Sequence, residues 1–447
     1  MKLLGQILAR VFGARGGGLG MLQTVLAQGG IVAVNVATGV ITARLLGPAG
    51  RGEFAAASMW FLLPSQLATV GLQSAVIYRT RLDPEQSASV GGAGLIIGLG
   101  LFVPSAVLCV ALLPSVLHAY SAAIVTLAQV AVLAAFLNVW MLLARQSLLG
   151  TRNVHLFNLS CAGSSVAYLL ALLLVLPLHA LDPATALYCQ FGATAAVLAP
   201  TLWWATRGWR WQALRPFAQL GALLRYSGQA AGVDLVTVFY WSIDRVILVG
   251  LIAPAEFGLY AVARSFAGLV GVLQAGFSSV MLADLAHKPA REIEVYIHRT
   301  LRLLVWPLVA ACIAGWLLGD VLMRLIYGDG FAPAVPIFRF LLLEAAISCL
   351  AQVLVEAFLA SGRPSYASTV QGAYSVLLLG ALLLLAPPLG GFGAALALLA
   401  AMLGKLALLL LGLRTIGIGF PGLLLRQDDI TSILRLLRGA SMPSPTD

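Results

Sequence analysis

A series of long apolar stretches, separated by short polar breaks, limits what this chain can fold into. A helix needs about 20 mostly apolar residues to cross a bilayer. Only 10% of the residues are charged, whereas a soluble protein has about 25%, so most of the surface must face lipid. The sequence therefore predicts an all-α polytopic membrane protein with about twelve transmembrane helices. The predicted spans are residues 21–46, 54–78, 90–113, 122–149, 156–178, 184–206, 226–252, 256–284, 301–327, 334–360, 366–386 and 391–413.

Basic residues alternate from one side of these spans to the other. The two termini and every second loop hold 20 of the 27 Lys and Arg residues, while the intervening loops hold Arg51 and otherwise acids or no charge. Because Lys and Arg concentrate in cytoplasmic loops, both termini are predicted to be cytoplasmic. The net charge of +10 then indicates contact with anionic lipid headgroups rather than nucleic acid.

A short elbow occurs twice in the chain, as "GPAGRGEFA" and "APAEFGLYA". A shift of 206 residues aligns Pro48 with Pro254 and Gly52 with Gly258. Since an even number of spans separates the copies, both halves have the same orientation, as in transporters built from parallel repeats. The predicted domains are an interfacial helix at 1–20, an N-lobe at 21–210, a C-lobe at 211–415, and an interfacial segment with a disordered tail at 416–447.

The elbow itself is predicted to be a rigid helical hairpin at the outer end of each lobe. Proline and glycine end the outgoing helix, and Gly52 or Gly258 lets the next helix pack closely. A contact between Arg51 and a transported molecule is left as an alternative, so Arg51 is not among the candidate site residues.

Two charged residues are predicted near the middle of the membrane, where a charge is costly and usually faces a cavity or another charge. Arg264 lies about eight residues into its span at ~1.5 Å per residue, too deep to reach either face. It is the leading candidate for a cation facing a cavity. Glu344 is similarly deep and is either its partner or a group that carries protons.

The seventh span carries a polar stripe in "DLVTVFYWSIDRV". Asp234, Trp241, Asp244 and Arg245 fall within an arc of about 100° on a helix, so this stripe must face protein or water. It could supply an aromatic platform and a cation for phosphate, or it could join the lobes. Asp244 could also form a solvated pair with Arg245.

Three further residues complete the candidate site. Asn35 lies on a polar seam of the first span, and Arg339 is shallow enough to reach outer water or a phosphate. Arg44 is included only because of the resemblance described next.

The motifs "ARLLGPAGRGEFA", "SIDRVILVGLIAPAEFGLYAVA" and "LIYGDGFAPAVPIFRFL" resemble those of Wzx-type polysaccharide flippases of the multidrug/oligosaccharidyl-lipid/polysaccharide exporter (MOP) superfamily. The resemblance implies two parallel six-helix lobes around a V-shaped central cleft. It also implies a flippase of the bacterial inner membrane that moves undecaprenyl-pyrophosphate-linked oligosaccharide from the inner to the outer leaflet. A polysaccharide polymerase and a chain-length regulator are the implied partners, besides membrane lipids.

Two other functions stay open within the same superfamily, a drug/cation antiporter and a lipid II flippase. An antiporter is expected to line its cleft with acids and aromatics rather than arginines. A membrane enzyme of polysaccharide assembly is disfavoured because every outer loop is short. We expect no catalytic residues, cofactor or metal, since the five His are scattered and no phosphate-binding lysine follows the Gly-rich "GGAGLIIGLG".

The remaining intramembrane charges and the five cysteines are predicted to be structural. Asp320 and Arg324 are spaced to pair, and Lys405 is near enough to the inner end of its span to snorkel. The cysteines all lie in predicted spans without metal-ligand spacing. The sequence leaves open the glycan, ion coupling and oligomeric state.

Overall fold

The computed structural model describes residues 18–177, 180–207, 215–271, 290–417 and 419. The regular structure in this part of the chain is helical, as predicted. Seven helical segments are long and apolar enough to cross a membrane. They are Gly29–Ala68, Pro84–Val116, Ala122–Gly150, Val154–Val175, Arg291–Tyr327, Ala334–Ala360 and Pro364–Ile416. Nearly all of the predicted N-terminal interfacial helix (1–20) and of the C-terminal segment (416–447) lies outside the described residues.

Two of the helices each contain two predicted spans. The helix α2 (Gly18–Ala68) covers the first span and most of the second, with one non-helical residue, Gly47, at φ 67° and ψ −179°. The helix α14 (Pro364–Gly412) covers the last two spans, with a similar break at Gly390. The first elbow is therefore shorter than predicted, because helix resumes at Pro48, where proline's fixed φ suits a helix start.

The remaining predicted spans also fall on helices, within the described residues. A positive-φ glycine, Gly71, separates α2 from α3 (Leu72–Leu82). The other helices are α4 (Ser87–Val116), α5 (Ala122–Ala134), α6 (Phe136–Gly150), α7 (Val154–Val175), α8 (Pro183–Thr206), α9 (Pro216–Leu251), α10 (Pro254–Ala267), α12 (Ala290–Tyr327) and α13 (Ala334–Ala360).

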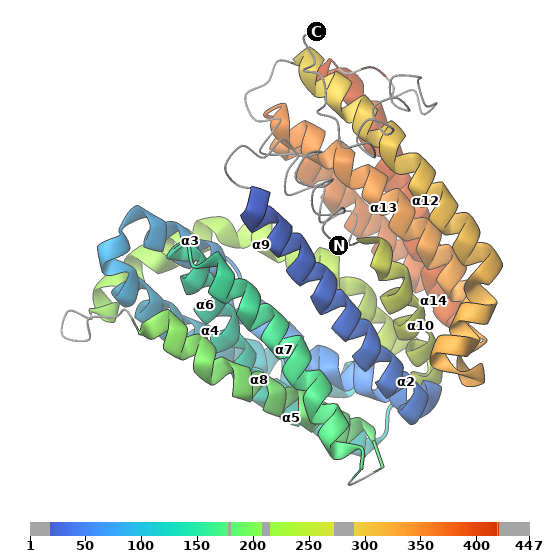
Figure 1. The fold of residues 1–447 in the computed structure, drawn as a ribbon, viewed down its shortest axis with the longest axis horizontal. Helices are drawn as coiled ribbons and strands as arrows, with labels where there is room; N and C mark the ends of the chain where they lie inside the picture. The colour runs from blue at the N-terminus through green and yellow to red at the C-terminus, as the bar shows by residue number, and fades with distance from the viewer. Residues whose placement is uncertain (1–17, 178–179, 208–214, 272–289, 418, 420–447) are drawn as a thin grey trace.

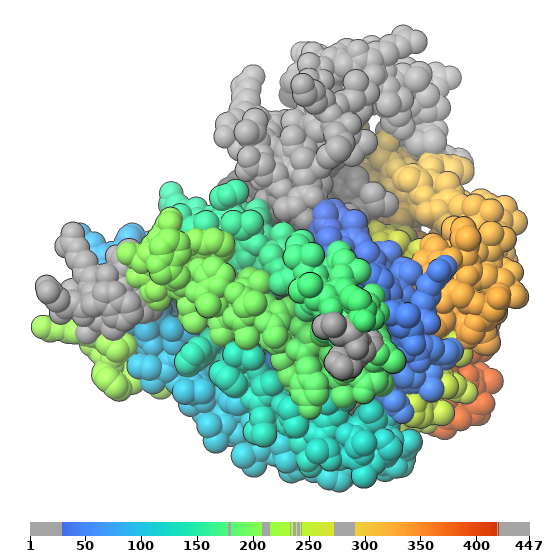
Figure 2. Space-filling model, turned by 60° about the horizontal axis from the view of Figure 1, so that its bottom comes forward, coloured from blue at the N-terminus to red at the C-terminus, as the bar shows by residue number. Residues whose placement is uncertain are grey.

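The helices form two groups that meet along α2, α9 and α10 (Figure 1). One group contains α2 to α8, and the other contains α10, α12, α13 and α14. The helix α9 packs against α3 and α4 of the first group and against α14 of the second, while α2 packs along α10. The space-filling view shows α2, in blue, between green helices of the first group and yellow-to-orange helices of the second (Figure 2).

Several small residues are fully buried where these helices pack. Ala43, Ala56 and Ala57 of α2 are fully buried, as are Ala394 and Ala395 of α14. Without a hydrophobic drive between helices in lipid, close van der Waals packing of small residues stabilises a helix bundle.

Gly390 provides the first test of this fold. Its φ of +57° and ψ of −139° are accessible essentially only to glycine, and a side chain there costs about 1–3 kcal/mol. An ideal Cβ would also overlap the carboxylate of Glu256, which accepts a hydrogen bond from Gly391 N at 3.2 Å. We therefore expect Gly390→Ala to lower the thermal unfolding midpoint of the protein in detergent.

The matched control is Gly380→Ala. Gly380 is in the same helix, and nothing lies within 4 Å of an ideal Cβ at that position. Alanine favours helix over glycine by about 1 kcal/mol, so this variant should be as stable as the parent protein or slightly more so. Equal unfolding midpoints for the two variants would contradict the strain at Gly390.

Candidate functional site

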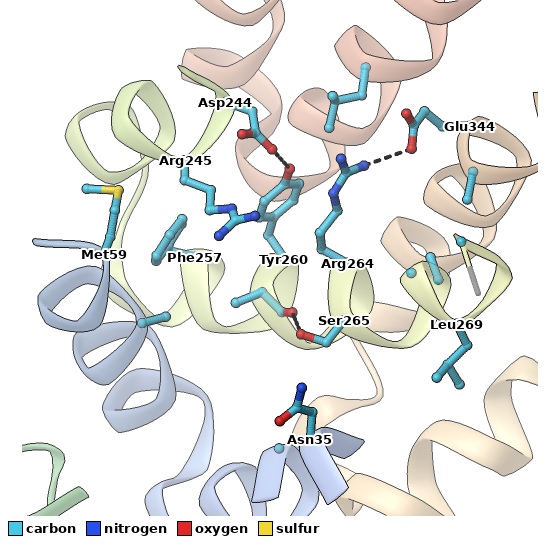
Figure 3. A pocket seen from close by; sticks show the side chains of 18 of the residues that line it. Asn35, Met59, Asp244, Arg245, Phe257, Tyr260, Arg264, Ser265, Leu269 and Glu344 are labelled. Atoms are coloured by element: carbon cyan, nitrogen blue, oxygen red, sulfur yellow. Dashed lines mark hydrogen bonds and ion pairs between the residues drawn. The ribbon is translucent and has the colours of Figure 1, made fainter. Parts of the chain in front are cut away.

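A cavity of about 550 Å³ lies where the two groups of helices meet. Its walls come from α2, α9, α10, α13, α14, the short helix η3 (Gly268–Val270) and Tyr327 of α12. Figure 3 shows Asp244, Arg245, Tyr260, Arg264 and Glu344 gathered on one side, with Asn35 opposite. The charged groups on that side therefore come from α9, α10 and α13.

Two walls of the cavity are the two copies of the elbow repeat. Six lining residues of α2 and six lining residues of the chain after Pro254 are related by the same shift of 206 positions. The pairs are Arg51 with Phe257, Phe54 with Tyr260, Ala55 with Ala261, Ser58 with Arg264, Met59 with Ser265, and Leu62 with Gly268. The two walls therefore have the same spacing of lining residues, but their chemistry differs. The cation of the first wall, Arg51, aligns with Phe257, and the cation of the second wall, Arg264, aligns with Ser58.

Arg264 and Glu344 form an ion pair at the cavity wall. Arg264 Nη1 donates to Glu344 Oε2 at 2.7 Å, and Glu344 is 3% exposed. A guanidinium has five N–H donors, and the Arg264 side chain remains 31% exposed. Arg264 can therefore satisfy Glu344 and still present donors to the cavity, so the two predicted roles, ion pair and cavity-facing cation, are compatible.

A second polar contact joins α9 and α10 beside this pair. The hydroxyl of Tyr260 donates to Asp244 Oδ2 at 2.9 Å, and both residues are buried. The neighbouring Arg245 is exposed and lines the cavity. Asp244 is thus held by Tyr260, and no ion pair between it and Arg245 occurs, contrary to the solvated pair considered from the sequence.

Arg51 is an arginine of the cavity lining that is not among the candidate residues from the sequence. Its Nε is buried with no hydrogen-bond partner, and its guanidinium carbon lies 5.2 Å from the centre of the Phe54 ring. Since Arg51 falls in an elbow that reads as an outer loop, depth along a span could not mark it. The signal available was that it is the basic exception among loops otherwise lacking basic charge.

The cavity therefore carries more positive than negative charge. Arg51, Arg245 and Arg264 line it, against the carboxylates of Asp244 and Glu344. In the described part of the chain, neither Arg51 nor Arg245 forms an ion pair. Arginine binds phosphate oxygens through paired N–H donors, so this arrangement suits an anion with several oxygens. No group of three potential metal ligands occurs among the described residues.

Lys405 corrects the expectation that it would snorkel to the membrane surface. It is 3% exposed, donates to Gln371 Oε1 at 2.9 Å and lies 5.5 Å from the centre of the Tyr374 ring. The hydrogen bond and the aromatic face compensate an ammonium that cannot reach water. Tyr374 itself lines the cavity, so Lys405 supports that wall from behind.

The structure brings together four of the eight candidate residues from the sequence. Arg264, Arg245, Glu344 and Asn35 all line the cavity. Trp241 lies in α9, but its side chain is outside the described residues. The other three candidates, Asp234, Arg44 and Arg339, are engaged elsewhere in the described structure and are absent from the cavity lining.

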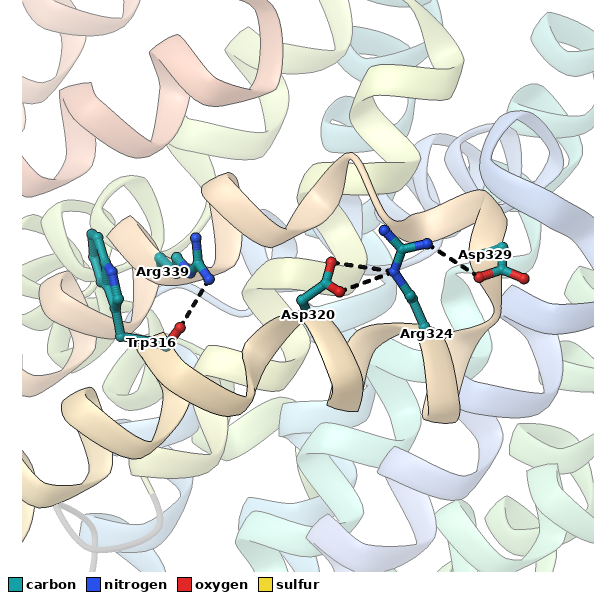
Figure 4. A network of polar contacts seen from close by, with 5 residues as sticks. All are labelled: Trp316, Asp320, Arg324, Asp329 and Arg339. Carbon is teal, nitrogen blue, oxygen red and sulfur yellow. Dashed lines mark hydrogen bonds and ion pairs between the residues drawn. The ribbon is translucent and has the colours of Figure 1, made fainter.

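Arg339 lies apart from the cavity, against α12 (Figure 4). Its Nη2 donates to the carbonyl of Trp316 at 2.9 Å, and its guanidinium carbon is 5.3 Å from the Trp316 ring centre. The predicted pair between Asp320 and Arg324 is confirmed at 3.1 Å on the same exposed surface. Arg339 therefore joins α13 to α12 rather than reaching the cavity.

Arg44 joins the two groups of helices, and Asp234 joins α9 to the first group. Arg44 Nε donates to the carbonyl of Ile326 at 2.7 Å, and its Nη2 donates to that of Leu325. Asp234 Oδ2 accepts from Gly71 N at 2.9 Å, at the break between α2 and α3. Of the two roles predicted for the polar stripe, this contact of Asp234 corresponds to the second, which is to join the lobes.

This chain is similar to known proteins in sequence and in fold. A family model described as "Polysaccharide biosynthesis protein" matches residues 41–336, about two thirds of the chain. That range includes the elbow, its repeat and most of the helices that line the cavity. No curated protein matches this sequence significantly.

Several solved membrane-protein structures have a similar fold. A structure titled "Lipid II flippase MurJ, inward closed conformation" has a TM-score of 0.74 at 12% identity and covers 93% of this chain and 92% of its own. An inward-facing multidrug resistance MATE family transporter of the MOP superfamily scores 0.72 at 15% identity, covering 87% and 94%. An outward-facing MATE structure scores 0.59 at 15% identity, covering 89% and 94%.

Proposed function

We infer, from the fact that this chain belongs to the polysaccharide biosynthesis protein family, that it moves undecaprenyl-pyrophosphate-linked oligosaccharide from the inner to the outer leaflet. The observation that carries this proposal is the cavity lined by three arginines and two carboxylates. A diphosphate group has several charged oxygens, which two arginines without carboxylate partners can bind with charge-assisted hydrogen bonds.

Family and fold together make the chain a multi-pass membrane transporter rather than an enzyme of polysaccharide assembly. Within this class of transporter we propose flippase activity. It needs no chemistry on the cargo, only binding of a charged headgroup in the cavity and its release on the other side. We accordingly assign no catalytic residue and no cofactor to this chain.

The proposed architecture has twelve spans in two parallel lobes, residues 21–210 and 211–415, with both termini in the cytoplasm of a bacterial cell. The lobes would rock about a V-shaped cleft and expose it to each face in turn. The diphosphate would lie against Arg245, Arg264 and Arg51, and the sugars would fill the rest of the cleft. The polyprenyl tail would stay in lipid between the lobes, where its burial in apolar surroundings costs nothing.

A polysaccharide polymerase and a chain-length regulator are the proposed partners, because a flipped unit must be consumed on the outer face to keep transport moving outward. The chemistry of the cargo determines which of its groups the positive cavity binds. A glycan with acidic sugars would use the same positive cavity, whereas a neutral glycan would rely on the diphosphate alone.

Two alternatives differ from this proposal by measurable outcomes. A lipid II flippase would carry the same diphosphate with a peptidoglycan precursor, and its loss would stop cell-wall synthesis. A drug/cation antiporter would bind positively charged molecules. The two arginines without carboxylate partners disfavour a cationic cargo, since like charge in a cavity of low dielectric is strongly repulsive.

The deciding experiment uses a strain that lacks this protein. We expect it to lose a surface polysaccharide and to accumulate the complete lipid-linked repeat unit, protected from periplasmic enzymes in spheroplasts. Normal polysaccharide together with new drug sensitivity would contradict the proposal and favour the antiporter. Arrest of cell-wall synthesis would favour lipid II as the cargo.

A further inference from the structure

The two elbows contact each other across the boundary between the helix groups. Gly52, four residues after Pro48, lies against the start of α10, and Gly258, four residues after Pro254, lies against the start of the second half of α2. Both glycines are buried. The sequence placed each glycine within its own hairpin, but the structure places each against the other copy of the repeat.

The contact is reciprocal at the level of individual atoms. An ideal Cβ on Gly52 would overlap the carbonyl oxygen of Pro254 and would lie 2.9 Å from Gly258 N. An ideal Cβ on Gly258 would overlap the carbonyl oxygen of Pro48 and would lie 2.9 Å from Gly52 N. Both obstructing groups are backbone, which cannot swing aside as a side chain can. Only glycine at both positions allows this approach.

The contact adjoins the cavity. The residues on either side of the two glycines, Arg51 and Phe54 on α2 and Phe257 and Tyr260 on α10, belong to the paired cavity walls. Since basic residues place the elbows on the outer face, the glycine contact lies at the outer end of the cavity. A separation of the two helices at this point would open that end.

Arg44 makes a second connection between the helix groups at the same end. Its guanidinium donates to the carbonyls of Leu325 and Ile326 in the last turn of α12. Carbonyls of a last helical turn have no partner within their helix and carry partial negative charge. An ideal Cβ on Gly330, just after α12, would lie 3.6 Å from Pro48 Cδ, so this part of the chain also meets the elbow.

We propose that Gly52, Gly258 and Arg44 form an outer latch, which holds the outer ends of the two lobes together while the cavity faces inward and must separate to release cargo outward. The latch rests on the proposed alternating-access function. The reciprocal geometry explains why the elbow is repeated: each copy supplies both the glycine and the carbonyl that the other copy needs. The better match to the inward-facing MATE structure than to the outward-facing one agrees with a closed outer end.

The test measures access to the cavity from outside. A cysteine replaces Ala55, which lines the cavity, in a background with the five native cysteines changed to serine or alanine. A membrane-impermeant maleimide added to intact spheroplasts should label this cysteine slowly. Adding Gly258→Leu should raise the labelling rate at least about tenfold, because the leucine side chain cannot fit against the Pro48 carbonyl. An unchanged rate at normal abundance would overturn the latch.

Matched variants separate the latch from general damage. Gly380→Leu places the same side chain at an exposed membrane glycine with nothing within 4 Å, and should leave labelling unchanged. Gly52→Ala and Gly258→Ala should each raise labelling, and the double variant should add little, since either methyl group alone separates the same surfaces. Two independent, additive effects would contradict a shared contact.

A disulfide provides the reverse experiment and does not depend on the identity of the cargo. Pro48→Cys with Gly330→Cys should crosslink on oxidation, hold the outer end closed and suppress labelling at Ala55→Cys; reductant should restore it. Failure of the crosslink to suppress labelling would overturn the latch. If labelling responds as expected but the deletion strain accumulates no lipid-linked sugar, the latch stands and the proposed cargo is wrong.

Discussion

Arg264→Ala is expected to reduce transport at least tenfold, which corresponds to about 1.4 kcal/mol. Two effects combine. The cavity loses a cation that faces the proposed headgroup site, and Glu344, which is 3% exposed, loses its partner at 2.7 Å. Breaking a buried pair by removing one member costs about 3–5 kcal/mol, so the variant protein should also be less stable. Transport is measured by lipid-linked sugar accumulation and surface polymer.

Because a stability defect alone could stop transport, the decisive variant removes both members of the pair. Arg264→Met combined with Glu344→Leu leaves neither member of this pair without the other, and such replacements are often neutral or stabilising. We expect this double variant to recover the parent's thermal midpoint and abundance but not its transport. Recovery of transport as well would mean that Arg264 serves the fold and does not bind cargo.

The second large effect is expected from the arginines without carboxylate partners. Arg51→Gln and Arg245→Gln should each weaken binding of an undecaprenyl-pyrophosphate probe to the purified protein, and the double variant should weaken it further. A hydrogen bond to a charged group contributes about 1.5–3 kcal/mol, so each substitution should raise Kd by roughly tenfold or more. Neither substitution strands a carboxylate, since neither arginine has an ion-pair partner in the described part of the chain.

The matched control for these two variants is Arg339→Gln. Arg339 is also a membrane-embedded arginine, but it donates to a carbonyl of α12 and stacks on Trp316 away from the cavity. Its substitution should leave the probe's Kd within about twofold of the parent value. An equal loss of affinity in all three variants would show that total positive charge, rather than the cavity, determines binding.

Depth in the membrane was a good guide to part of the site. Arg264 and Glu344 could be singled out because mid-bilayer charge is costly and must be compensated, and the structure gives them one ion pair at the cavity wall. The same argument was less informative near the ends of spans. Arg44 and Arg339 are charged residues at such depths, and both donate to backbone carbonyls at helix surfaces.

Lys405 shows the limit of treating one helix at a time. Its distance from the inner end of a span allows snorkelling, but the two halves of α14 on either side of Gly390 lie together, so the ammonium meets Gln371 and Tyr374 before it can reach water. Arg51 shows the converse. A residue assigned to a loop becomes part of a cavity wall because helix resumes directly at Pro48.

The sequence by itself determined the membrane environment, the helical class and the repeated elbow, because these follow from local apolar length, charge placement and the positions of Gly and Pro. Only the tertiary structure decided what the repeat does. Gly52 and Gly258 are 206 positions apart, and no local pattern in either copy predicts that their backbones meet. That contact, like the cavity behind it, depends on how two distant helices pack, which is set by close steric fit between surfaces rather than by any local pattern.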